Sequence, residues 1–114
     1  MILILQERAT PKQMRQMLEA LGIYIKLAVD IELGMIAGGG ELHADCEQLL
    51  LAGDSQQANV WGADWYPVSQ TVGYESIVNI RPTANNRSME IQSPALREQV
   101  NQVVQSLLGG VRWQ

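Results

Sequence analysis

The stretch that decides the fold is residues 23–40, which read IYIKLAVDIELGMIAGGG. Apolar and polar side chains alternate along residues 23–32, and a period of two is typical of a strand with one buried face. The turn Glu32-Leu33-Gly34 follows, where glycine tolerates a positive φ. Residues 35–38 then return as the second arm of a hairpin. The chain should therefore contain an antiparallel sheet that is built outward from this hairpin.

Helices are predicted on both sides of the hairpin in the sequence. Residues 11–21 follow Thr10-Pro11-Lys12-Gln13, which contains an N-cap, a proline at the first helical position and the glutamine of a capping box. Residues 42–52 place apolar side chains on one helical face, although 41–47 also alternate as a strand would. Ser93-Pro94 opens a last helix, which two glycines at 109–110 end.

Shorter strands complete the expected order. Residues 2–5, 74–80 and 87–92 each favour a strand, whereas 53–71 are predicted to form a long loop that holds Trp61 and Trp65. The result is a single α+β domain over residues 1–110, in the order β-α-β-β-α-β-β-α, with a tail over 111–114. We expect a two-layer sandwich with a mainly antiparallel sheet and helices on one face, because its strands have one apolar face. Its first six elements match a ferredoxin-like split βαβ pattern with extensions.

Composition excludes several classes of function. The chain has 114 residues, a net charge of −4 and only two lysines, so it lacks the basic surface that nucleic acids require. A single cysteine allows no internal disulfide and no cysteine-cluster zinc site. No apolar run approaches the length of a membrane span. We therefore expect a protein of the reducing cytoplasm that binds neither nucleic acid nor membranes.

The densest polar group, here called the acidic cluster, follows three glycines and consists of Glu41, His43, Asp45 and Glu47. On a strand all four side chains would project to one side, at a spacing suited to acid–base chemistry or a divalent cation. On a helix they would form two i, i+4 pairs on neighbouring faces. The metal-ligand candidates are His43, Asp45 and Glu47, and one imidazole with carboxylates suits Mn²⁺, Fe²⁺ or Zn²⁺. The simpler alternative is a solvated helix start whose acidic residues stabilise the helix dipole.

Two further groups could bind a ligand. Asn79, Arg81, Asn86 and Arg87 flank a predicted turn, where two guanidinium groups could hold a carboxylate or phosphate in bidentate fashion. The same residues could simply form the turn. Trp61 and Trp65 could line a pocket, form an interface hot spot, or cover the edge of the sheet.

The chain resembles a known family in several motifs. These are residues 29–45, Trp61-Gly62-Ala63, Asn79-Ile80-Arg81-Pro82 and Asn86-Arg87-Ser88. They are similar to a family of small uncharacterised prokaryotic proteins, known as a domain of unknown function. The likeness runs from the first strand to the last helix and implies a compact bacterial domain. It carries over no activity, substrate or catalytic residue.

We expect one of two functions. The first is a non-enzymatic binding domain that self-associates as a homodimer, because the chain is acidic, lacks a known catalytic set and has surplus aromatic residues. The alternative is a small metal-dependent or acid–base hydrolase that uses the acidic cluster, with Arg81 binding an anionic ligand. No cofactor is expected under the first function, and a divalent metal ion is expected only under the second.

Overall fold

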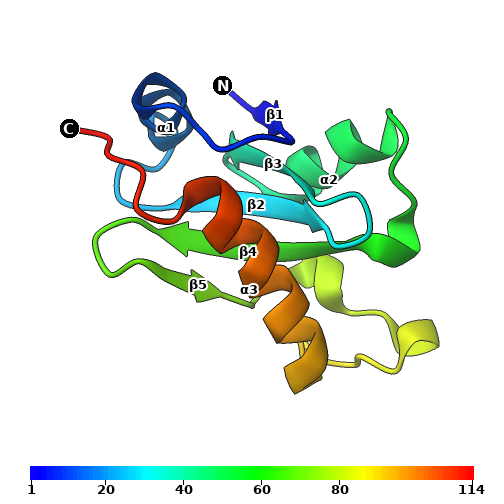
Figure 1. The fold of residues 1–114 in the computed structure, drawn as a ribbon. Coiled ribbons are helices and arrows are strands. Elements are labelled where there is room, and N and C mark those ends of the chain that lie inside the picture. The colour runs from blue at the N-terminus through cyan, green and yellow to red at the C-terminus, as the bar shows by residue number, and fades with distance from the viewer.

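The protein has five strands in one antiparallel sheet, as a computed structural model of residues 1–114 shows (Figure 1). The strands lie in the order β1-β3-β2-β4-β5. Their bounds are Leu3–Leu5 for β1, Ile25–Asp30 for β2, Met35–Gly40 for β3, Val60–Tyr66 for β4 and Thr71–Gly73 for β5. The α+β class is confirmed. Strands β1 and β2 both run antiparallel to β3, which lies between them, so β1, α1 and β2 form a split βαβ unit. The ferredoxin-like order is not confirmed beyond this unit.

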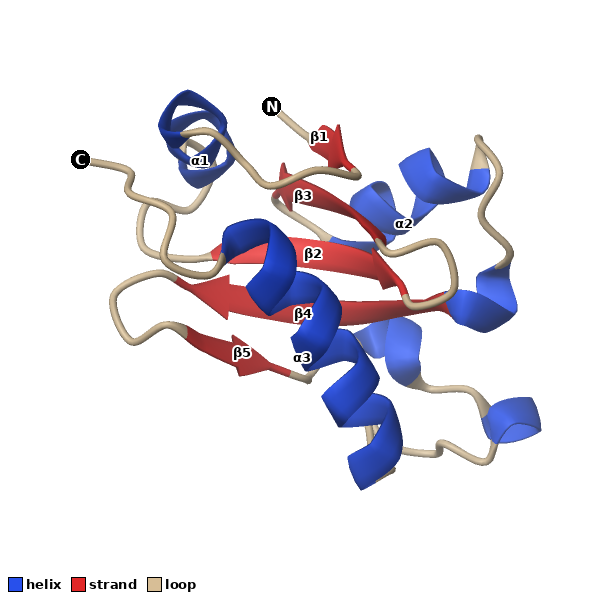
Figure 2. Cartoon of the chain, in the orientation of Figure 1, coloured by secondary structure: helices blue, strands red, loops and turns tan.

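Helices cover both faces of the sheet, and the prediction of helices on one face is therefore wrong (Figures 1 and 2). Helices α1 (Pro11–Leu18) and α3 (Pro94–Leu108) share a core with Leu27 of β2. Helix α2 (His43–Leu51) packs on the opposite face, where its buried side chains meet Ala28. In the alternation along residues 23–32, Ala28 falls on the same side as the polar residues. It is nevertheless buried, and its small side chain lets α2 approach the sheet.

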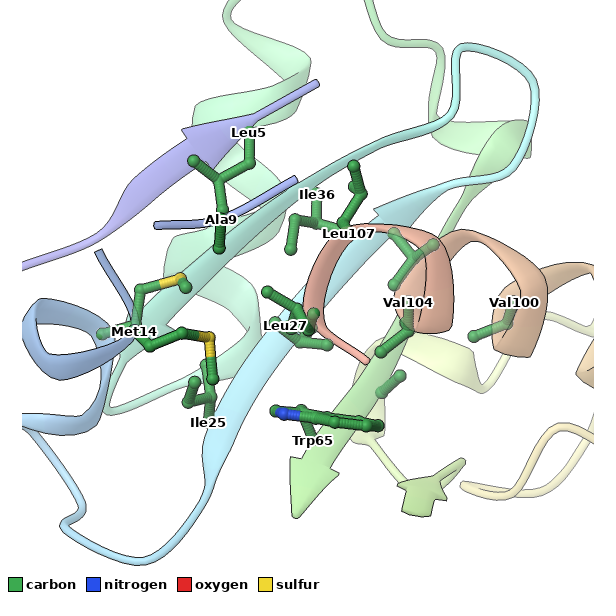
Figure 3. Close-up of a cluster of buried hydrophobic side chains, with 14 of the residues drawn as sticks. Leu5, Ala9, Met14, Ile25, Leu27, Ile36, Trp65, Val100, Val104 and Leu107 are labelled. Carbon is green, nitrogen blue, oxygen red and sulfur yellow. The ribbon is translucent and has the colours of Figure 1, made fainter. Parts of the chain in front are cut away.

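The larger core lies between the sheet and helices α1 and α3 (Figure 3). It is mostly aliphatic, with methionines from α1 and valines from α3 around Leu27. Trp65 lies among them with 0% of its surface exposed, and Trp61 is also buried. Both tryptophans belong to β4, so the predicted loop over 53–71 is wrong across that strand. They fill the core and offer no interaction surface.

Residues 74–90, here called the 74–90 segment, do not form the predicted strand over 74–80. Two short 3₁₀ turns, Ile77–Asn79 and Pro82–Ala84, replace it. Isolated bridges join Glu75 to Glu90 and Arg81 to Asn86, so the predicted returning strand over 87–92 is also absent. Proline cannot donate to a ladder, and asparagine side chains bind the backbone here in place of a neighbouring strand.

Several predictions from local sequence patterns are confirmed outside the 74–90 segment. Thr10 and Gln13 form the predicted capping box of α1, although this helix ends at Leu18. Residues 43–51 are helical, which settles the alternative between helix and strand for 41–47. None of the helices combines the length and apolar character that crossing a membrane requires. Val111, at the start of the predicted tail, is buried against the larger core.

The three glycines at 38–40 belong to β3 and allow close packing. A Cβ atom at Gly38 would lie 2.6 Å from Cδ2 of Leu27. Gly39 has a φ of +106°, and a Cβ there would lie 2.5 Å from the carbonyl oxygen of Met1. A register shift between β2 and β3 occurs at the same point. The glycines thus meet a steric requirement of the sheet.

Candidate functional site

A pocket of about 600 Å³ opens on the face of the sheet that α2 covers. It lies between the beginning of α2, the strands β2 and β4, and the 74–90 segment. The apolar part of its wall comes from Leu42, Ile77, Val78 and Met89. Leu42 and Ile77 are 58% and 74% exposed, so much of this wall is open to solvent.

The polar part of the pocket contains His43 and Asp64, which are joined by a hydrogen bond. His43 is the first residue of α2, and its Nε2 lies 2.8 Å from Oδ1 of Asp64 and 3.1 Å from the carbonyl oxygen of Ala63. Their side chains are only 12% and 11% exposed. Because both partners of Nε2 are acceptors, this nitrogen carries the hydrogen in the neutral ring. Nδ1 makes no hydrogen bond within the chain and is an acceptor in this tautomer.

Two other charged side chains line the pocket. Lys26 lies opposite Asp64 in the register of β2 and β4, and its Nζ donates to the carbonyl oxygen of Glu41 at 2.9 Å. Lys26 forms no ion pair with Asp64. Glu75 is exposed and also forms no ion pair. The pocket thus holds charged groups that are not neutralised by contacts within the chain.

Two tyrosines form the end of the pocket beside Asp64. The rings of Tyr24 and Tyr66 stack with their centroids 5.4 Å apart and their planes 11° apart. Burial raises the pKa of the Tyr66 phenol, and the charges of Asp64 and Glu75 act in the same direction. The phenol therefore stays protonated and can donate a hydrogen bond at neutral pH.

The structure does not bring the acidic cluster together. His43 binds Asp64, whereas Glu47 lies 3.3 Å from Arg81, and Glu41 and Asp45 are exposed. No group of three or more His, Cys, Asp or Glu side chains is arranged to hold a metal ion. The residues proposed as metal ligands, His43, Asp45 and Glu47, therefore have separate surroundings.

Arg81 lies outside the pocket, and its guanidinium group is engaged within the chain. The guanidinium carbon lies 4.4 Å from the centre of the Trp61 ring. Its nitrogens donate to Glu47 and to the carbonyl oxygens of Gln57 and Val60. Burial lowers the pKa of the Arg81 guanidinium, and the Glu47 carboxylate opposes this effect. Arg81 thus binds the segment before β4, and the structure gives it no free donor pair for an anionic ligand. Arg87 is exposed and lies outside the pocket.

Asn79 and Asn86 hold the 74–90 segment, which forms one wall of the pocket, through buried side-chain hydrogen bonds. Asn79 is fully buried, and its side chain accepts from the Gly62 amide at 2.8 Å and donates to the Gly62 carbonyl at 3.0 Å. It thereby pairs with β4 beyond the point that short β5 reaches. Asn86 donates to the Asn79 carbonyl at 2.8 Å and to two further carbonyls. These amides hold the 74–90 segment in place.

Sequence reasoning missed Asp64, Lys26 and Glu75. Asp64 lies within residues 53–71, where polar residues with Gly62 and Pro67 favour a loop. The signal that could have found it is the alternation of Trp61, Ala63 and Trp65, which has the period of a strand. That period would have put Asp64 on the opposite face from the tryptophans, and facing α2.

Comparison with known proteins identifies a family whose function is unknown. A family described as protein of unknown function (DUF5674) matches residues 3–107. No curated protein and no solved structure matches the chain.

Proposed function

We propose a function from the pocket itself, because the chain belongs to the DUF5674 family, whose function is unknown. In this proposal the protein binds a small ligand. The ligand would occupy the pocket between α2 and the 74–90 segment. The single observation that supports this proposal is the composition of the pocket, which combines an apolar wall with the mostly buried His43–Asp64 pair.

The dimensions of the pocket agree with this function. Ligand sites in proteins have volumes of about 300–1,000 Å³ and combine apolar walls with a few polar groups. The pocket has a volume of about 600 Å³, and seven of its twelve lining residues are hydrophobic. The exposed side chains of Leu42 and Ile77 give a ligand apolar surface to cover. Removing such surface from water contributes about 25 cal/mol per Å².

A second candidate is acid–base catalysis in the same pocket. The observation in its favour is His43 itself, whose Nε2 is oriented by Asp64 while Nδ1 has no hydrogen bond within the chain. A base that is oriented by a carboxylate is the arrangement of many hydrolases. This version differs from the hydrolase expected from the sequence, because Asp64 takes the place of the neighbouring carboxylates of the acidic cluster.

Nuclear magnetic resonance of ¹⁵N-labelled protein tests ligand binding directly. We expect small aromatic fragments such as phenol, benzamide and indole to bind with Kd values of about 1 mM. Shift changes should concentrate on the amides of residues 42–44, 62–66 and 74–78. Chemical conversion of a bound fragment in the same sample would favour the catalytic candidate.

Replacing two alanines of the chain by tryptophan, one inside the pocket and one outside it, provides the control. Ala44 lines the pocket at the exposed start of α2, whereas Ala52 is exposed just after the end of this helix. Ala44→Trp should fill the pocket and abolish the shift changes, and Ala52→Trp should leave them intact. Fragments that bind both variants equally well would show that the pocket is not their site.

A further inference from the structure

Resting on this proposed function, we infer that the pocket selects a small apolar amine. The protonated amino group would lie between Asp64 and Glu75, and the hydrocarbon part would lie against Leu42, Ile77 and Met89.

The first argument is that the carboxylates of Asp64 and Glu75 have oxygens that accept no hydrogen bond within the chain. Asp64 accepts one hydrogen bond, on Oδ1 from His43, and its Oδ2 has no partner within the chain. Glu75 has neither a side-chain hydrogen bond nor an ion pair. Oδ2 of Asp64 is not one of the buried atoms that lack a partner, and Glu75 is exposed, so both carboxylates are open to a group in the pocket. An ammonium group, which donates three hydrogen bonds, would bond to these oxygens in place of water.

The second argument is the balance of charge around the pocket. The lining has two carboxylates, Asp64 and Glu75, and one ammonium group, that of Lys26. Lys26 directs one of its donors to the Glu41 carbonyl at the start of α2, and is not paired with Asp64. A bound carboxylate would add a third negative charge, whereas a bound ammonium would balance the existing excess.

The tyrosine pair adds a weaker attraction of the same sign. The faces of aromatic rings carry partial negative charge and attract cations within about 6 Å. Tyr24 and Tyr66 line the pocket beside Asp64 and are stacked on each other. Burial raises the pKa of the Tyr66 phenol most, and the negative charges of Asp64 and Glu75 raise it further.

The test compares three probes that share one hydrocarbon part and differ in the polar end: phenethylamine, 2-phenylethanol and 3-phenylpropionate. In titrations followed by ¹⁵N NMR at low salt, phenethylamine should bind about tenfold more tightly than 3-phenylpropionate. The alcohol should lie between them. Raising the salt concentration should reduce the difference, because salt screens exposed charges.

Variants assign the preference to particular carboxylates. Asp64→Asn and Glu75→Gln should each reduce the preference for phenethylamine severalfold. The exposed Asp45 does not line the pocket, so Asp45→Asn, which removes the same charge, should leave the preference unchanged. Glu75 is exposed and its replacement is compatible with folding, so the test does not depend on the buried Asp64 variant alone.

The outcomes separate this inference from the proposed function. If 3-phenylpropionate binds as tightly as phenethylamine and Ala44→Trp blocks both, the pocket binds ligands but the amine preference is wrong. If Glu75→Gln and Asp64→Asn both leave the preference at its original value, the inference is also overturned. If none of the three probes binds, both the inference and the proposed function fail.

Discussion

Replacing Asn79 by alanine should lower the free energy of unfolding by about 3–5 kcal/mol, because several buried backbone groups lose their partner at once. The Asn79 side chain bonds to the amide and carbonyl of Gly62 and to the carbonyls of Tyr74 and Met89. Alanine also leaves a cavity, since Asn79 is fully buried. Urea denaturation followed by circular dichroism measures the change.

A second asparagine provides the control for this variant. Asn101 lies on α3 and is partly exposed, and its side chain accepts one long hydrogen bond from Gln105 at 3.4 Å. Asn101→Ala should change stability by less than about 1 kcal/mol, because alanine is the better helix former. Equal effects of the two substitutions would contradict the role assigned to Asn79. Asn79→Ala should also weaken fragment binding, because Asn79 anchors the 74–90 segment and this segment forms one wall of the pocket.

Replacing Arg81 by alanine should destabilise the protein by about 3–5 kcal/mol, because it leaves the buried Glu47 carboxylate without a partner. Arg81 and Glu47 have side chains that are 11% and 9% exposed, with 3.3 Å between them. The guanidinium group also covers the Trp61 ring and bonds to the Gln57 and Val60 carbonyls. Thermal and urea denaturation of the variant measure the loss.

The matched control is Arg87, which is exposed and forms no ion pair. Arg87→Ala should alter stability by no more than about 0.5 kcal/mol. The double variant Glu47→Gln with Arg81→Met should recover part of the stability lost in Arg81→Ala, since no unpaired charge remains. A double variant as unstable as the single one would show that the charge of Glu47 is not the cause.

Local signals in the sequence were sufficient for the elements near the N-terminus. The hairpin of β2 and β3 follows from alternation and Gly34, and α1 follows from the capping box at Thr10. These features depend on residues within one or two turns of each other, which a single sequence displays directly. The last helix, with Ser93 as its cap, was predicted for the same reason.

Features that depend on distant residues were not predictable in this way. The sequence predicts a loop in place of strand β4 because Gly62, Pro67 and several polar residues favour loops, yet a glycine is required at position 62. A Cβ there would lie 2.5 Å from Cβ of Ser76, in a segment more than ten residues away. The strand expected over 74–80 is absent because Asn79 bonds to β4 through its side chain, which propensity alone does not reveal.

The candidate site was predicted only in part. His43 was singled out, but the partners expected for it were its neighbours in sequence, whereas its actual partner Asp64 is 21 residues away. Placing residues 41–47 on a helix separates His43 from Asp45 and directs Glu47 towards Arg81. The identity of the partner depends on how α2 packs across β4, and no local pattern encodes that packing.

The most direct test of the ligand site uses His43, which is the only histidine in the chain. A long-range ¹H–¹⁵N spectrum of the imidazole, recorded at about pH 8.5 where imidazoles are neutral, reports which nitrogen carries the hydrogen. The structure predicts a single Nε2–H tautomer, fixed by Asp64 and the Ala63 carbonyl, and an Nδ1 signal that moves when phenethylamine is added. An Nδ1–H tautomer, or imidazole signals that do not change when the amine is added, would contradict the account of this pocket.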